Sequence, residues 1–126
     1  MKPRPGTKAP GIFDAVRQLG LALPDVEAAT KYDGSPVLKM RGCFLAGMAT
    51  HRSAEPATLV VRTRLEERES LIADAPGTYY LTAYYRRHPV VLVRLPCIDR
   101  DALRDVLTVS WRLTAAKTRA RTRRRR

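Results

Sequence analysis

Short β-type runs separated by short turns are the feature that most constrains what this chain can fold into. "PVLKMRG" (36–42) alternates apolar and basic side chains, and its Arg41-Gly42 end can turn the chain into "CFLAGMATH" (43–51). "TLVVR" (58–62) is short and rich in β-branched residues. Side chains that alternate with a period of two are typical of half-buried strands, and such short turns join antiparallel neighbours. We therefore predict an antiparallel sheet.

Two more strands are predicted in the second half of the chain. "TYYLT" (78–82) and "PVVLVRL" (89–95) have the composition of paired strands, with "AYYRRH" (83–88) as the tip of the hairpin between them. Pro89 has no amide hydrogen, so it suits the first position of a strand or an edge. "DVEAATKYDGS" (25–35) is polar and rich in turn residues, and we expect no strand there. The predicted sheet has five strands.

Three helices are predicted from apolar residues with a period of 3.6. The first covers residues 12–19, and the second runs to about residue 74 after a capping box made by Thr63 and Glu66. The third begins after Asp99, a favourable N-cap. The predicted order is α-β-β-β-α-β-β-α, which defines a two-layer α+β domain with helices packed on an antiparallel five-stranded sheet.

Positive charge is concentrated at the two ends of the chain. The net charge is +12, yet residues 11–116 hold 14 basic and 12 acidic residues and are nearly neutral. We expect a flexible basic arm (1–10), a single domain (11–116) and a disordered Arg-rich tail (117–126). The tail carries seven positive charges, which favour polyanions such as nucleic acid. A solubilising tail without a partner is the simpler alternative.

The apolar and cysteine patterns bear on the cellular location of the protein. No run of 18 or more apolar residues is present, and no apolar signal core follows the basic N-terminus. We therefore expect no membrane span and a cytoplasmic location. In that compartment Cys43 and Cys97 are expected to be small buried thiols rather than a disulfide framework.

Patterns that carry catalysis or metal binding are missing from the sequence. There is no phosphate-binding glycine loop, no His-Glu-x-x-His and no Gly-x-Ser-x-Gly. His51, His88, Cys43 and Cys97 do not have the spacing of a structural zinc site. We expect no enzymatic activity, no catalytic residues, no metal and no cofactor.

Two segments could contact nucleic acid. In the predicted hairpin tip, tyrosines could stack on unpaired bases while arginines reach the backbone. In the tail, cationic side chains could form salt-sensitive phosphate contacts. The tyrosines could instead alternate in and out of the sheet as ordinary strand residues. The candidate residues are Tyr84, Tyr85, Arg86, Arg87, His88, Lys117, Arg119, Arg121, Arg123, Arg124, Arg125 and Arg126.

The chain resembles the MmcQ/YjbR-like proteins over roughly residues 12–117. The resemblance is carried in order by "LALPDVEAAT", "YDGSPVLKMRGCFLAGM", the long block "TLVVRTRLEERESLIADAPGTYYLTAYYRRHPVVLVRL" and "DRDALRDVLTVSWRLTAAK". It implies a secretion-chaperone-like α+β fold and a DNA-binding role, and it supplies no catalytic residues.

These observations lead to a hypothesis and an alternative. The hypothesis is a non-enzymatic nucleic-acid-binding protein whose expected partner is DNA, bound without sequence specificity. The alternative is a protein-binding adaptor or chaperone-like module, in which the basic tail is incidental.

Overall fold

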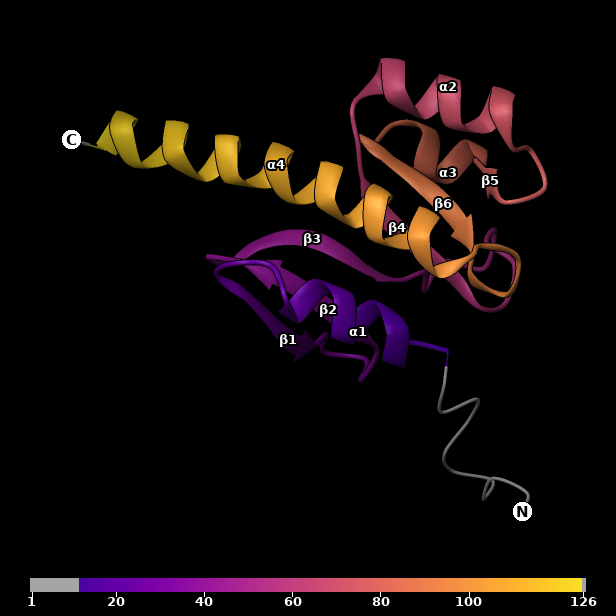
Figure 1. Ribbon diagram of the computed structural model, residues 1–126, viewed down its shortest axis with the longest axis horizontal. Helices are drawn as coiled ribbons and strands as arrows, with labels where there is room; N and C mark the ends of the chain where they lie inside the picture. Colours follow the sequence, from indigo (N-terminus) through magenta and orange to yellow (C-terminus); the bar gives the residue numbers. More distant parts are fainter. Residues whose placement is uncertain (1–11, 126) are drawn as a thin grey trace.

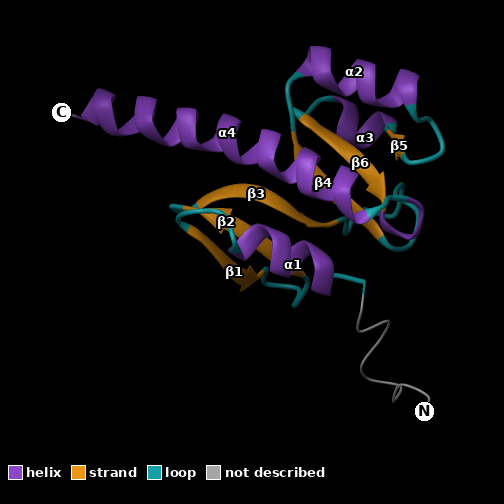
Figure 2. Cartoon of the chain, viewed as in Figure 1, coloured by secondary structure: helices purple, strands orange, loops and turns teal. Residues whose placement is uncertain are grey.

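The fold is α+β, with an antiparallel sheet packed with helices, as predicted. The computed structural model describes residues 12–125, with side chains through residue 121 (Figures 1 and 2). The elements are α1 (Asp14–Leu21), β1 (Val26–Thr30), β2 (Pro36–Met40), β3 (Cys43–Met48), β4 (Thr58–Arg62), α2 (Leu65–Asp74), β5 (Tyr79–Tyr80), α3 (Ala83–Arg86), β6 (Val90–Arg94), a 3₁₀ turn (Leu95–Cys97) and α4 (Arg100–Arg125).

The sheet has six strands, where five were predicted. Their order is β1-β2-β3-β4-β6-β5, and each neighbouring pair is antiparallel. The additional strand is β1, which lies in the segment expected to be turns. It pairs along its full length with β2 but is mostly exposed. An exposed edge strand needs little apolar alternation, so its sequence resembles a polar loop.

The two faces of the sheet pack against different helices. Leu59 and Val61 of β4 belong to the larger core, together with Leu107 of α4 and residues of α1 and α2. Val60 points to the opposite face and packs with Tyr85 of α3. Successive side chains of a strand alternate between faces, so one β-branched strand contributes to both clusters.

The segment predicted as a hairpin tip is a short helix. The strand at its start is limited to β5, and α3 occupies residues 83–86. Thr82 is the N-cap of α3, and its hydroxyl accepts a hydrogen bond from the amide of Tyr85 at 3.4 Å. The connection between β5 and β6 therefore packs on the sheet through Tyr85 instead of forming an exposed hairpin tip.

The helix caps divide into one confirmed and one wrong prediction. The carboxylate of Asp99 accepts a hydrogen bond from the amide of Ala102 at 2.8 Å, as predicted. The Thr63 capping box is wrong, because the N-cap of α2 is Arg64 and no side chain caps it. Thr63 instead donates its amide to the carbonyl of Pro89 at 2.9 Å, which extends the β4–β6 pairing by one residue.

Helix α4 is longer than the predicted domain. It runs through Arg125, so residues 117–125 are helical where we expected a disordered tail, and Figure 1 shows this end extending past the sheet. Thr118 is buried, which places at least the start of the expected tail against the folded body. The indole of Trp111 donates to the carbonyl of Pro24 at 2.8 Å and joins α4 to the loop after α1.

Two further expectations concern the cysteines and the membrane. Cys43 is buried as predicted, whereas Cys97 is exposed, because the 3₁₀ turn that contains it has no buried residues. Over residues 12–125 no helix combines the length and the apolar character needed to cross a membrane.

Candidate nucleic-acid interface

The structure separates the five candidates of the α3 region. Tyr85 is only 8% exposed and packs on the sheet, so it is part of the smaller core. Tyr84 is 42% exposed. Arg86, Arg87 and His88 are exposed at the end of α3 and in the turn that follows. α3 and the turn after it thus expose one tyrosine and three basic residues to solvent, while the second tyrosine packs on the sheet.

A cavity of about 430 Å³ lies beside α3, and we call it the α3 pocket. Its aromatic lining is Phe44, Tyr84 and Tyr85. Its basic lining is Lys31, Arg62, His88 and Lys117. Thus four of the predicted residues, from α3, the turn after it and α4, meet around one cavity.

The electrostatics of the α3 pocket favour an anion. No carboxylate is among the described residues that line it. Arg62 donates through Nε to the carbonyl of Phe44 at 2.9 Å, and Lys31 donates to the carbonyl of Met48 at 3.3 Å. These bonds hold the two side chains in place without neutralising them. The Asp33 carboxylate interacts electrostatically with Lys31 but does not line the pocket. Because the lining itself holds cations and no carboxylate, its local potential is positive, which favours phosphate or another anion.

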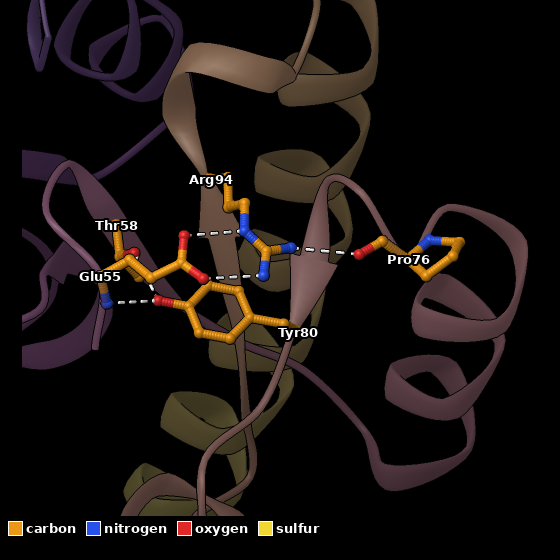
Figure 3. Close-up of polar contacts among 5 residues, drawn as sticks. All are labelled: Glu55, Thr58, Pro76, Tyr80 and Arg94. Carbon is orange, nitrogen blue, oxygen red and sulfur yellow. Dashed lines mark hydrogen bonds and ion pairs between the residues drawn. The ribbon is translucent and has the colours of Figure 1, made fainter. Parts of the chain in front are cut away.

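Other basic side chains are already paired with acids. Arg94 forms two hydrogen bonds to Glu55, at 2.9 and 2.8 Å, donates to the carbonyl of Pro76, and lies over the ring of Tyr80 (Figure 3). The hydrogen bonds from Arg94 lower the pKa of the Glu55 carboxyl. Arg41 donates through two nitrogens to one oxygen of Asp25, at 3.1 and 2.6 Å. Neither arginine is a good candidate for phosphate contact.

Two residues of the loop before β4, His51 and Ser53, support α3 and do not line the pocket. The amide of His51 donates to the Tyr85 hydroxyl at 3.2 Å. The Ser53 hydroxyl lies 2.8 Å from Nδ1 of His51 and 2.9 Å from the hydroxyl of Thr82, the N-cap of α3. This chain of hydrogen bonds fixes the start of α3, and therefore the direction in which Tyr84 projects.

The basic end of α4 continues outward from the α3 pocket. Lys117 lines the pocket, and Arg121 follows it by four residues on the same helical face. Lys117, Arg119 and Arg121 are exposed. The candidate side chains of Arg123, Arg124, Arg125 and Arg126 lie outside the described residues.

A second cavity, of about 410 Å³, has the opposite charge and lies between α2 and α4. Its acidic lining is Glu66, Glu67, Asp74 and Asp105, with no basic residue among its described lining. Burial, followed by Asp99 and Asp105, raises the pKa of Tyr79, which also lines this cavity. These carboxylates repel phosphate, so this cavity is a poor candidate for polyanion contact. Residues 12–125 contain no group of side chains arranged to hold a metal ion.

Sequence reasoning missed Lys31, Phe44 and Arg62 as pocket residues. Arg62 could have been found, because it lies two residues after Val60 and therefore on the same face of β4. β4 pairs with β6, the strand that follows "YYRRH". Lys31 could not have been found, because it follows β1, a strand that was not predicted. Phe44 could not have been found either, because its place in the pocket depends on a register shift between β2 and β3. The sheet order, rather than a motif, brings these residues together.

Comparison with known proteins identifies the family. A family model described as YjbR matches residues 21–113, which is most of the chain. The chain therefore belongs to the MmcQ/YjbR family, as the resemblance in its sequence led us to expect. No solved structure gives a significant match.

Curated relatives share part of the chain. "Uncharacterized protein Rv2570" of Mycobacterium tuberculosis (strain ATCC 25618 / H37Rv) is 35% identical over 68 residues, which are 52% of this chain and 53% of the relative. "Uncharacterized protein Mb2600" of Mycobacterium bovis (strain ATCC BAA-935 / AF2122/97) gives the same values. The chain spans about half the length of the curated relatives that it matches.

Proposed function

We propose that this protein binds nucleic acid, with DNA as the expected form, and that it does so without catalysing a reaction. The observation that carries the proposal is the α3 pocket, which gathers Lys31, Arg62 and Lys117 around aromatic side chains with no carboxylate among its described lining. The helix that supplies Lys117 continues into the Arg-rich end of the chain. Lys117 in the pocket and the exposed Arg121 on the same face of α4 supply cations for a phosphate backbone beyond the pocket itself.

Binding of this kind is dominated by phosphate contacts, so it depends on salt. Each neutralised phosphate releases counterions, and the logarithm of the affinity falls with the logarithm of salt concentration by about 0.9 for every contact on duplex DNA. We expect the full-length protein to bind DNA without strong sequence preference and to lose affinity steeply as salt rises.

The test compares two double variants with the same change in formal charge. Lys117→Gln/Arg121→Gln removes two exposed cations that share one face of α4. Arg41→Gln/Arg104→Gln removes two cations that pair with Asp25 and Asp101 elsewhere. Fluorescence anisotropy against salt concentration should show a slope reduced by about two for the first variant only.

Two results would contradict the proposal. The first is absence of salt-dependent binding to DNA and RNA by the wild type. The second is an equal effect of the two double variants, because affinity would then depend on net charge rather than on this surface. If nucleic-acid binding is absent and a stoichiometric protein partner persists after nuclease treatment, the adaptor alternative is favoured.

A further inference from the structure

We propose that the α3 pocket receives one unpaired nucleotide, so that the protein binds single strands in preference to duplexes. The base would lie against Tyr84 and Phe44, and its phosphate against Arg62, Lys31 and Lys117. This inference rests on the proposed function and names the form of nucleic acid that the same site would take.

The size of the cavity selects an unpaired nucleotide. About 430 Å³ lies within the range of pockets that enclose a small ligand. A base inside a duplex is paired and stacked, and it must leave the helix before it can enter a pocket. A duplex can therefore reach the basic rim and the end of α4, but it cannot fill the cavity.

Tyr84 has the properties of a stacking platform. The residue is 42% exposed and lines the cavity, and its ring lies against the imidazole of His51 with ring centroids 3.6 Å apart. The edge of Tyr85 meets it at 5.0 Å. A ring held by two neighbours loses little side-chain freedom when a base stacks on it, and base–aromatic stacking is tolerant of sequence.

The cations are arranged for a single phosphate group. Nε of Arg62 is bound to a backbone carbonyl, which holds the guanidinium in place while its other N–H groups make no hydrogen bond to a described residue. A planar guanidinium can donate two parallel hydrogen bonds to a phosphate. Lys31 and Lys117 add two further charges around the same cavity.

The experiment uses the full chain and three labelled or competing ligands. They are an oligothymidine of about twelve nucleotides, the matched duplex and free thymidine 5′-monophosphate. The length of the oligothymidine lies within the site sizes of single-strand-binding domains. We expect the wild type to bind the single strand at least about tenfold more tightly than the duplex, since a stacked base contributes roughly that factor.

Three variants separate the pocket from the rest of the surface. Tyr84→Ala should weaken single-strand binding about tenfold and change duplex binding less than about twofold, whereas Tyr84→Phe should keep the stack and most of the affinity. Leu65→Ala is the control, because it removes an exposed large side chain on the other layer. Circular dichroism and a thermal melt confirm that each variant is folded.

The outcomes distinguish this inference from the proposed function. If neither nucleic acid binds, the proposed function fails. If both bind with the same affinity and the same salt dependence, or if Tyr84→Ala weakens both equally, only the inference is overturned. If the free monophosphate binds as tightly as the oligomer, the ligand is a free nucleotide and the strand-binding inference is also overturned.

Discussion

The imidazole of His51 lies parallel to the ring of Tyr84, with centroids 3.6 Å apart and an angle of 6° between the planes. His51 comes from the loop before β4 and Tyr84 from α3, which are far apart in the sequence. His51 does not line the α3 pocket, so it supports Tyr84 from outside. The orientation of the exposed tyrosine is thus set by a residue that no local pattern connects to it.

We expect Tyr85→Phe to destabilise the fold by about 1 kcal/mol. The buried Tyr85 hydroxyl accepts the amide hydrogen of His51 at 3.2 Å, and removing it leaves that donor without a partner. Urea denaturation followed by tyrosine fluorescence measures the change. The control is Tyr84→Phe, because the Tyr84 hydroxyl makes no hydrogen bond to a described residue. Equal stabilities of Tyr85→Phe and wild type would contradict the role of this bond.

Arg68→Met should cost about 2–3 kcal/mol of unfolding free energy. Arg68 is 7% exposed, and one terminal nitrogen donates to the carbonyls of His88 at 2.9 Å, Val90 at 3.2 Å and Arg86 at 3.4 Å. Methionine fills similar space but leaves these buried acceptors unpaired, and hydrogen bonds from charged donors are the stronger ones. Chemical denaturation of Arg68→Met beside Glu69→Ala, an exposed neighbour, checks it.

The same prediction has a local consequence for the α3 pocket. The carbonyls that Arg68 binds belong to the end of α3, to His88 in the turn that follows, and to the start of β6. We therefore expect faster hydrogen exchange of the amides of residues 86–88 and 90 in Arg68→Met than in Glu69→Ala. Uniform exchange rates in the two variants would show that Arg68 does not hold this turn.

Regular elements with their own periodicity or cap could be predicted from the sequence. β2 and β4 were found through alternation and β-branched residues, and the start of α4 through Asp99. Each of these signals is local, because it depends on side chains that are only a few positions apart in the sequence. The family assignment rests on the same local segments taken together.

Elements defined by their partners could not be predicted. β1 is a strand because β2 pairs with it, and its own side chains are mostly exposed. α3 was missed because tyrosines suit a strand as well as a helix, and the choice depends on Thr82 and on the carbonyls bound by Arg68. The α3 pocket depends on β1 and on α3, so the sequence revealed the α3 residues of the pocket but not its full lining.

Gly20→Ala should destabilise the protein by about 1 kcal/mol, although alanine favours helices. The first helix was predicted over residues 12–19, but Gly20 lies inside α1, which continues to Leu21. A Cβ at this position would overlap a methyl carbon of Leu38, which is fully buried in β2. Overpacking a core costs about 1–3 kcal/mol, and the gain in helix propensity offsets about 1 kcal/mol of it.

A matched substitution separates these two effects. A Cβ at Gly77 would meet no atom within 4 Å, so Gly77→Ala should change stability by less than about 0.5 kcal/mol. Thermal unfolding of both variants at one pH makes the comparison. A Gly20→Ala variant more stable than wild type would show that α1 moves away from β2 at little cost.

The stabilising contribution of Glu55 should disappear in acid. Hydrogen bonding to Arg94 lowers the pKa of the Glu55 carboxyl below its ordinary value of 4.5 in the folded protein. A group with a lowered folded pKa stabilises the fold above its unfolded pKa, and this stabilisation is lost as pH falls through the folded pKa. The difference in melting temperature between wild type and Glu55→Gln should therefore be constant above about pH 5 and shrink below pH 4.5. Asp33, whose pKa is lowered by Ser35, titrates in both proteins and cancels in this difference. A difference that stays constant down to about pH 2, well below the ordinary pKa of 4.5, would show that the Arg94 contact does not depend on the Glu55 charge.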